Sequence, residues 1–301
     1  MSCSFGSPKT IYLDVLEKYF LDKVYCEIPL LHFLQRYPKF KLIVTNFPSI
    51  RRYKGGLEFH NKLPTYVDMM KLLSSGDNAT VETTLDRFGY KKEEQQELVG
   101  IPRIKTNPDG TTYMEATAKN SLRRIQGRGR ATAYQPEHYV NKIYFFGSCH
   151  QFGMNAPFNK TIESYLQLML NEADLPYRVE NEGQYYFGRR QDVFYNLNAL
   201  KPAPGDIIFI WFHNWATDAL PLFKFNDVFD PPHDYREIFC TQHHVNELGY
   251  KLVAEKFFNY LTTNNFFRDK QFTYPLPQKK SSLRHPAAIR DGRLSSGQFR
   301  A

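Results

Sequence analysis

Lys142 to Gly153 reads Lys-Ile-Tyr-Phe-Phe-Gly-Ser-Cys-His-Gln-Phe-Gly, and this stretch decides the fold class. A short apolar run of strand-favouring residues ends at Gly147, and Ser148, Cys149 and His150 follow it. A strand that breaks at a glycine into a tight turn, with a nucleophile-type residue at its carboxyl end, is a common active-site layout in open α/β sheets. The stretch therefore predicts a sheet strand with a reactive turn directly behind it.

Strands and helices alternate along the chain after this turn. Hydrophobic periodicity predicts helices at residues 161–173, 192–200 and 246–261, with Thr161 as the N-cap of the first. Apolar runs predict strands at residues 142–146, 177–180 and 206–212, and a last short strand at residues 238–240. Alternation of this kind predicts an α/β fold with three layers, α/β/α, around a parallel sheet.

The region before this alternation carries no recognisable constellation of reactive residues. It predicts helices at residues 10–20, 28–37, 66–73, 81–88 and 91–99, a strand at 40–44, and a hairpin around Asn107-Pro108-Asp109-Gly110. Residues 123–133 are basic and rich in glycine, which favours a linker or hairpin over a phosphate-binding loop because the glycine spacing matches no such motif. We therefore predict a mixed α/β or mainly helical N-terminal region of unknown role at residues 1–135, and a second domain at residues 136–268.

Composition limits the class of protein. Hydrophobic residues make up 42% of the 301 residues, which suits a globular chain with a sizeable core. The four cysteines form no CxxC pair, so neither a disulfide framework nor a zinc site is indicated, and we predict no metal. No apolar stretch approaches the roughly 18 residues of a membrane span, and no signal-peptide pattern opens the chain. We therefore predict a reducing, cytoplasmic setting.

The positive charge is concentrated at the C-terminal end. Residues 268–301 carry eight basic and two acidic residues, a net charge of +6 out of +8 for the chain. The composition predicts a disordered tail at residues 269–301. Such a tail is either a solvated segment or a contact with an acidic polymer or membrane surface. We expect no nucleic-acid partner, because no repeated pattern of basic and aromatic residues accompanies the abundant aromatics.

Polar and reactive side chains follow each predicted strand. The carboxyl ends of parallel strands open on one edge of a sheet, so these side chains are expected to gather there. The candidates are Ser148, Cys149 and His150 after the first strand, Asn181 and Gly183 after the second, His213 and Asn214 after the third, and Cys240, Thr241, His243 and His244 before the last helix. They include a nucleophile, amide and backbone N–H donors and histidine bases, which are the parts of an acyl-transfer site.

The order of these segments resembles the SGNH hydrolase superfamily, the GDSL-type esterases, lipases and acyltransferases. That family has four sequence blocks. In chain order they contain a Gly-Asp-Ser turn, a glycine, a Gly-x-Asn motif and an Asp-x-x-His motif. The corresponding segments here are Gly147-Ser148-Cys149, Asn181-Glu182-Gly183, Phe212-His213-Asn214 and the run from Thr241 to Tyr250. The resemblance covers about 130 residues, from Asn141 to Phe267, and its first and last blocks carry most of it. The resemblance implies a flavodoxin-like arrangement of the parallel sheet.

The chain departs from the family pattern at four positions. Cys149 stands at the nucleophile position, Ser148 where the family has Asp, Phe212 where it has Gly, and Thr241 at the acidic position. A cysteine can replace the serine, because a thiolate is a strong nucleophile once a neighbouring group lowers its pKa. The departures leave open whether the nucleophile is Cys149 or Ser148, and whether the site is active.

The resemblance implies a role for each candidate. Cys149, or else Ser148, would attack an acyl carbonyl, His244 would take and return the proton, and Thr241 would orient His244. Backbone N–H groups of Cys149, Gly183 and Asn214 would hold the oxyanion, with His213 beside the substrate. The substrate would be an ester on a carbohydrate or another small polar molecule. No cofactor is implied, although a transferase would need an acyl donor such as acetyl-CoA.

Two alternatives come from other classes of protein. One is an SGNH-like binding module that has lost the catalytic serine and aspartate and binds its ligand without turnover. The other is an interaction protein that acts through its N-terminal region and basic tail, and its binding to an acidic partner would weaken with salt.

Overall fold

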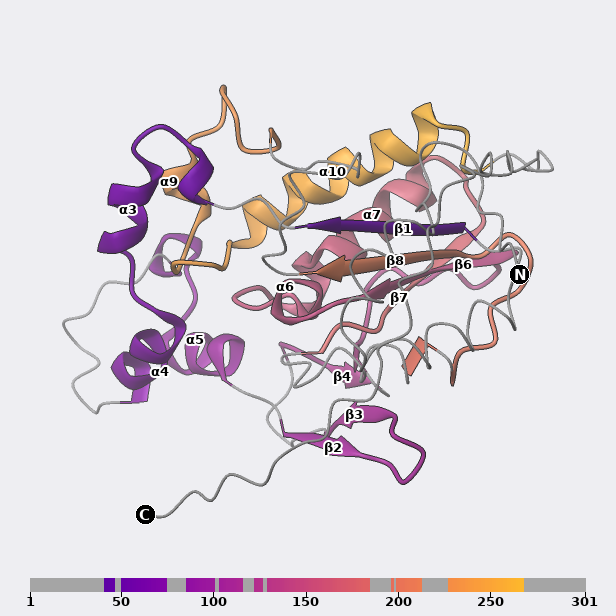
Figure 1. Ribbon diagram of the computed structural model, residues 1–301, viewed down its shortest axis with the longest axis horizontal. Helices are drawn as coiled ribbons and strands as arrows, with labels where there is room; N and C mark the ends of the chain where they lie inside the picture. The colour runs from indigo at the N-terminus through magenta and orange to yellow at the C-terminus, as the bar shows by residue number, and fades with distance from the viewer. Residues whose placement is uncertain are drawn as a thin grey trace, which may run out of the picture.

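The computed structural model describes residues 41–46, 50–74, 85–100, 103–115, 122–126, 129–184, 196–197, 199–212 and 227–267 (Figure 1). The predicted helices at 10–20 and 28–37, most of the helix at 192–200 and the C-terminal tail lie outside these residues. His213 and Asn214 also lie outside them.

The described chain is an α/β structure built on one six-stranded sheet. The strands are β1 (Lys41–Asn46), β4 (Ile125–Gln126), β5 (Gly129–Arg130), β6 (Asn141–Phe146), β7 (Tyr177–Asn181) and β8 (Ile207–Phe212), in the spatial order β1-β8-β6-β7-β5-β4. The first four strands in this order run parallel. The hairpin of β4 and β5 adds to β7 in the antiparallel direction. The sheet is therefore mixed, whereas the sequence predicted a parallel one.

The sheet uses strands from both sides of residue 135. β1 pairs with β8 from Lys41 opposite Ile207 to Asn46 opposite Phe212, and β4 and β5 also come from the N-terminal region. The basic, glycine-rich segment at 123–133 contains this hairpin, so the hairpin alternative from the sequence is confirmed. The predicted strands at 40–44, 142–146, 177–180 and 206–212 correspond to β1, β6, β7 and β8.

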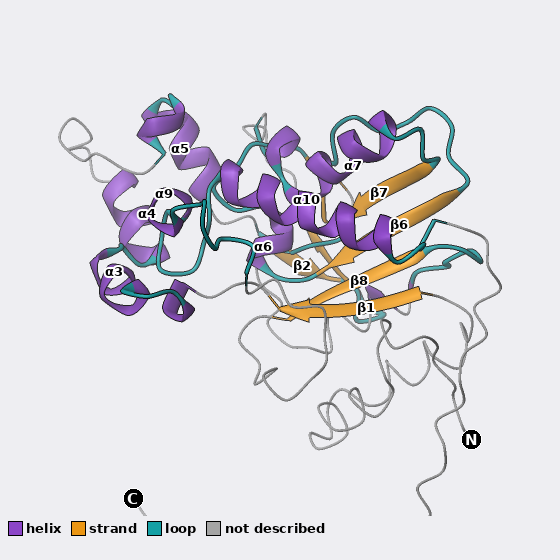
Figure 2. Ribbon diagram, turned by 90° about the horizontal axis from the view of Figure 1, so that it is seen from above, coloured by secondary structure: helices purple, strands orange, loops and turns teal. Residues whose placement is uncertain are grey.

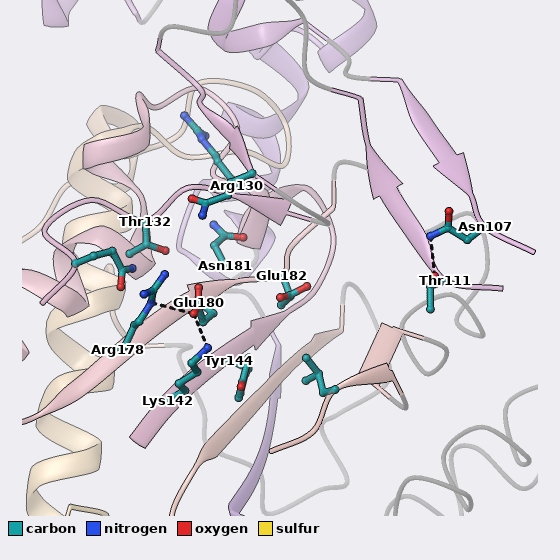
Figure 3. A pocket seen from close by; sticks show the side chains of 13 residues that line it. Asn107, Thr111, Arg130, Thr132, Lys142, Tyr144, Arg178, Glu180, Asn181 and Glu182 are labelled. Carbon is teal, nitrogen blue, oxygen red and sulfur yellow. Dashed lines mark hydrogen bonds and ion pairs between the residues drawn. The ribbon is translucent and has the colours of Figure 1, made fainter. Parts of the chain in front are cut away.

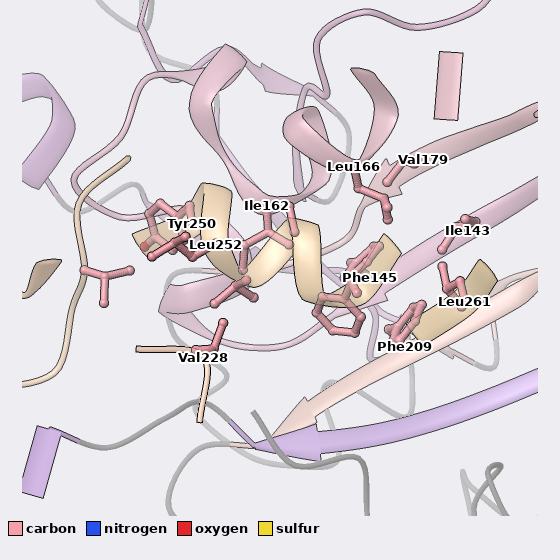
Figure 4. Packing of buried hydrophobic residues seen from close by; sticks show 14 of the residues in the cluster. Ile143, Phe145, Ile162, Leu166, Val179, Phe209, Val228, Tyr250, Leu252 and Leu261 are labelled. Carbon is pink, nitrogen blue, oxygen red and sulfur yellow. The ribbon is translucent and has the colours of Figure 1, made fainter. Parts of the chain in front are cut away.

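Two long helices cover one face of the sheet. Figure 2 shows α7 (Ile162–Glu172) and α10 (Glu247–Thr263) on the same side of the strands. Alternate strand residues point toward them and form the main core (Figure 4), which includes Ile143, Phe145, Val179, Ile207 and Phe209 from the sheet, and Ile162, Leu166, Leu170, Val253, Phe257 and Leu261 from the helices. Each such buried side chain contributes about 1.5–3 kcal/mol of transfer free energy. This core holds the carboxyl ends of the strands in place.

Side-chain caps begin both helices, and the sequence predicted the first of them. Thr161 accepts a hydrogen bond from the Ser164 N–H, and Asn246 accepts one from the Gly249 N–H. The N-cap prediction for Thr161 is therefore confirmed. These bonds satisfy backbone donors that the first turn of a helix leaves without partners.

Asn246 holds two segments together, so its replacement by alanine has a measurable cost. Its Oδ1 accepts the Gly249 N–H at 3.2 Å, and its Nδ2 donates to the Glu237 carbonyl at 2.6 Å. We expect Asn246→Ala to lower the free energy of unfolding by about 2 kcal/mol. Asn259→Ala, at an exposed position of the same helix, is the control, and it should change stability by less than about 0.5 kcal/mol. Urea unfolding of both variants tests this, and equal midpoints would contradict it.

The N-terminal region contributes short helices and a separate hairpin. Its elements are η2 (Ile50–Arg52), α3 (Gly56–Lys62), α4 (Tyr66–Ser74), η3 (Asp86–Phe88), α5 (Lys92–Val99) and the antiparallel pair β2 (Ile104–Thr106) and β3 (Thr112–Met114). The predicted helices at 66–73 and 91–99 and the hairpin around Asp109 are confirmed. Within the described part of the predicted helix 81–88, only the 3-10 turn η3 forms.

The predicted strand at 238–240 is wrong. The helix α9 (Tyr235–Ile238) occupies its start, and Phe239 makes only an isolated antiparallel bridge to Val245. Asp234 caps this helix by accepting the Arg236 N–H. This cap favours a helical turn over the strand that the apolar residues 238–240 favour locally. Ile238 and Phe239 are buried in the main core, and Cys240 is buried against α4.

Candidate functional site

The reactive turn lies where the sequence places it, at the carboxyl end of the central strand β6. Ser148 precedes the short helix α6 (Cys149–Phe152), and Gly153 ends it with a φ of 76°. At this φ an L side chain is strained, and a Cβ would also come within 2.5 Å of Thr161 Cγ2. The glycine therefore lets the chain turn sharply enough to hold Cys149 at the sheet edge.

Cys149 lies in a mainly apolar environment. Its partly buried side chain packs against the cluster of Met114, Phe152 and Met154. Its Sγ lies 3.8 Å from Ser148 Oγ and 3.7 Å from His150 Nδ1. Burial raises the pKa of the Cys149 thiol to about 11, despite the hydrogen bonds from Ser148 and the backbone. The resting thiol is therefore protonated at neutral pH.

His150 lies beside Cys149 and contacts two further histidines. His150 is 1% exposed, and its Nε2 donates to the His243 carbonyl at 2.7 Å. Its ring stacks on the ring of His244, with 5.3 Å between ring centroids. The structure thus joins the turn after β6 and the segment before α10, which are far apart in sequence. The sequence placed His150 among the candidate residues but assigned it no individual role.

Thr241 and His244 lie together as expected. The Thr241 hydroxyl lies 3.0 Å from His244 Nδ1. The same oxygen accepts the backbone N–H groups of His243 at 3.4 Å and His244 at 3.1 Å. His244 is 6% exposed and Thr241 is 1% exposed, so this contact is shielded from solvent. The hydroxyl is in place to orient the ring, and its catalytic role remains a prediction.

Gly183 packs against the helix that begins at Cys149. A Cβ at Gly183 would lie 2.5 Å from the backbone carbon of Gln151. Asn181 ties the same segments together, since its Nδ2 donates to the Gln151 carbonyl and its Oδ1 accepts the Gly183 N–H at 2.9 Å. The Gly183 N–H therefore already has an acceptor, and it would have to leave Asn181 to bind an oxyanion.

Arg130 supports the site, and the sequence did not reveal it. This 2% exposed side chain donates to the backbone carbonyls of Arg123, Phe152, Gly153, Leu122 and Ala156. Three of those carbonyls belong to α6 or to the chain that follows it. Burial lowers the pKa of Arg130 to about 9. The local sequence does not reveal that Arg130 binds these carbonyls, because the basic segment around it predicts only a linker or hairpin.

A second buried charge-bearing group lies on α7. Glu163 is 0% exposed, and neither of its carboxyl oxygens has a hydrogen-bond partner among the described residues. Burial raises the pKa of Glu163 to about 8, although nearby polar groups and the Arg130 charge oppose the shift. The carboxyl group is therefore mainly protonated at neutral pH.

A polar cavity of about 550 Å³ lies near this site and does not include Cys149 or His244 (Figure 3). Its wall carries Lys142 and Tyr144 of β6, and Arg178 and Glu180 of β7, all from residues that alternate with the core positions of these strands. Glu180 Oε1 lies 3.0 Å from Lys142 Nζ and 3.0 Å from Arg178 Nε. The cavity thus opens on the side of the sheet away from α7 and α10.

Comparison with protein-family models, curated proteins and solved structures finds no match to this chain. Among the described residues, no group of three or more His, Cys, Asp and Glu side chains could hold a metal ion. In the same part of the chain, no helix is long and apolar enough to cross a membrane. The geometry around Cys149 is therefore the main indication of function.

Proposed function

We propose that the chain is an SGNH-like enzyme that hydrolyses or transfers an ester-linked acyl group through the thiol of Cys149. The substrate would be a carbohydrate or a similar small polar molecule, as the family resemblance implies. The proposal includes the flavodoxin-like arrangement of that family and a reducing, cytoplasmic compartment, where a thiol nucleophile stays reduced.

One observation carries this proposal. The turn after β6 and the segment before α10 come together, so that Cys149 Sγ, the His150 ring and the His244 ring lie in one cluster. A nucleophile beside a histidine at the carboxyl end of a central parallel strand suits acyl transfer. The SGNH-like order of blocks predicts the same meeting of the first and last blocks.

The raised pKa of Cys149 bears on the mechanism. With a thiol pKa of about 11, only about one molecule in ten thousand carries the thiolate at neutral pH. The proton must therefore leave during the attack, to a nearby base. The sulfur–carbon bond forms, the carbonyl electron pair moves to oxygen, and the thiol proton moves to a histidine nitrogen. The leaving alkoxide then takes that proton, and water or an acceptor hydroxyl cleaves the thioester.

A binding module is the second candidate. The raised pKa of the Cys149 thiol and the threonine in place of the acid both favour it. In that case Cys149, His150 and His244 belong to a binding site that holds a ligand without turnover. The two candidates differ in whether Cys149 forms a covalent acyl adduct.

Replacing Cys149 by alanine separates these candidates. After brief exposure to p-nitrophenyl acetate, we expect a single acetyl adduct in the parent protein, and at least about a hundredfold less in Cys149→Ala. Intact-protein mass spectrometry measures the adduct. Cys240→Ala is the matched control, because Cys240 is 1% exposed and lies in a separate cluster with Met69 and Leu73. It should acetylate like the parent.

Other results would change the proposal. An adduct that persists in Cys149→Ala would move the nucleophile to Ser148. No adduct in the parent, together with slow alkylation of Cys149 by iodoacetamide, would reject the thiol enzyme and favour the binding module.

A further inference from the structure

The two stacked histidines beside Cys149 are hydrogen-bonded in different ways. His150 Nε2 lies 2.7 Å from the His243 carbonyl oxygen, which can only accept a hydrogen bond. Nε2 must therefore carry a hydrogen, and in the neutral ring the lone pair is on Nδ1. That nitrogen lies 3.7 Å from Cys149 Sγ. His150 thus presents an acceptor to the thiol.

His244 has the opposite arrangement at its Nδ1. The Thr241 oxygen accepts two backbone N–H groups, from His243 and His244. These bonds occupy its two lone pairs, so its own hydrogen points to His244 Nδ1 at 3.0 Å. Nδ1 is then the acceptor, and Nε2 carries the hydrogen in the neutral ring. An aspartate at position 241 would accept from Nδ1–H and reverse this tautomer.

We infer that His150 is the catalytic base that takes the Cys149 proton. His244, in contrast, is a hydrogen-bond donor through its Nε2–H and does not act as the base. This inference rests on the proposed acyl-transfer function. The thiol proton moves to His150 Nδ1 as sulfur attacks, and the His243 carbonyl stabilises the resulting imidazolium through its Nε2–H. The proton then passes from Nδ1 to the leaving oxygen, which restores the neutral ring.

The stacking of the rings supports this division of roles. The centroids of His150 and His244 are 5.3 Å apart, so two imidazolium ions there would repel each other. The ring that accepts the thiol proton therefore needs a neutral neighbour. The Thr241 hydroxyl stabilises the neutral form of His244, whereas a carboxylate would stabilise its cation.

Glutamine variants test the inference. His150→Gln keeps an N–H group that can donate to the His243 carbonyl, but it removes the base. We expect it to slow acetylation of Cys149 by p-nitrophenyl acetate by about 10²- to 10⁴-fold. His244→Gln keeps a donor at the ring's place, and we expect a loss of about tenfold or less.

A second measurement determines the tautomers in the protein with its own site residues. In the parent protein labelled with ¹⁵N-histidine, we expect both rings in the Nε2–H form at a pH where they are neutral. The glutamine variants identify which signals belong to His150 and His244. A hydrogen on Nδ1 of neutral His150 would overturn the inference.

The outcomes separate the inference from the proposed function. If the parent acetylates and His244→Gln loses far more rate than His150→Gln, the function stands and the inference is wrong. If the parent does not acetylate, the proposed acyl-transfer function is wrong. The rate of Cys149 alkylation then tests whether His150 accepts the thiol proton. Equal rates of Cys149 alkylation by iodoacetamide in the parent and His150→Gln would then overturn the inference as well.

Discussion

Arg130→Met is expected to lower the free energy of unfolding by about 3–4 kcal/mol, the largest effect we expect from a single change in the sheet edge. The guanidinium donates to five backbone carbonyls, two of which, those of Phe152 and Gly153, lie at the end of α6. Methionine has a similar length but no donor, so these carbonyls lose their shared partner inside the protein. The energy lost exceeds the gain from removing a charge whose burial lowers its pKa to about 9.

Arg124→Met in the same segment is the matched control for this change. Arg124 is exposed, and its guanidinium carbon lies 3.8 Å from the centroid of the Phe158 ring. Loss of this cation–π contact should cost about 1 kcal/mol or less. Urea unfolding of both variants gives the two values. If Arg130→Met and Arg124→Met prove equally stable, Arg130 does not hold the end of α6.

Glu163→Gln is expected to stabilise the protein at about pH 8 and to change little below pH 4.5. The folded state holds the Glu163 pKa at about 8, above its ordinary value of 4.5. Below pH 4.5 the carboxyl is protonated in both folded and unfolded chains, so its contribution to stability is fully present. As pH rises toward 8, the unfolded chain ionises first, and up to about 5 kcal/mol of stability is lost. Glutamine stays neutral and avoids this loss.

Glu172→Gln is the control, because Glu172 is exposed at the end of the same helix, α7. Unfolding in guanidinium chloride below pH 4.5 and at about pH 8 should show a growing advantage for Glu163→Gln and none for Glu172→Gln. Parallel pH curves for the parent and Glu163→Gln would show that Glu163 ionises freely in the folded protein.

The strands and helices that carry the site could be predicted from the sequence because their signals are local. The apolar run before Gly147 and the run at 206–212 form adjacent parallel strands, β6 and β8. Thr161 caps α7, and Asn246 caps the helix predicted at 246–261. Periodicity, glycine and capping residues each act within a few positions along the chain, so they can be recognised without knowing what lies opposite.

Elements stabilised by distant partners were less predictable. The hairpin of β4 and β5 is only a few residues long, and Arg130 joins it to the sheet by pairing with Asn181 of β7. The segment at 238–240 resembles a strand, but the Asp234 cap and packing against α10 produce a short helix and one bridge. In both cases the deciding contacts lie outside the local segment.

The same division holds for the candidate site. The sequence by itself determined that a nucleophile-type residue, Cys149, follows a buried strand, and that Thr241 and His244 precede the last helix. Only the tertiary structure decided that His150 faces the thiol and that Arg130 is buried beneath α6. Local patterns specify which residues share an element, whereas tautomers, burial and pKa values depend on atoms that distant segments bring together.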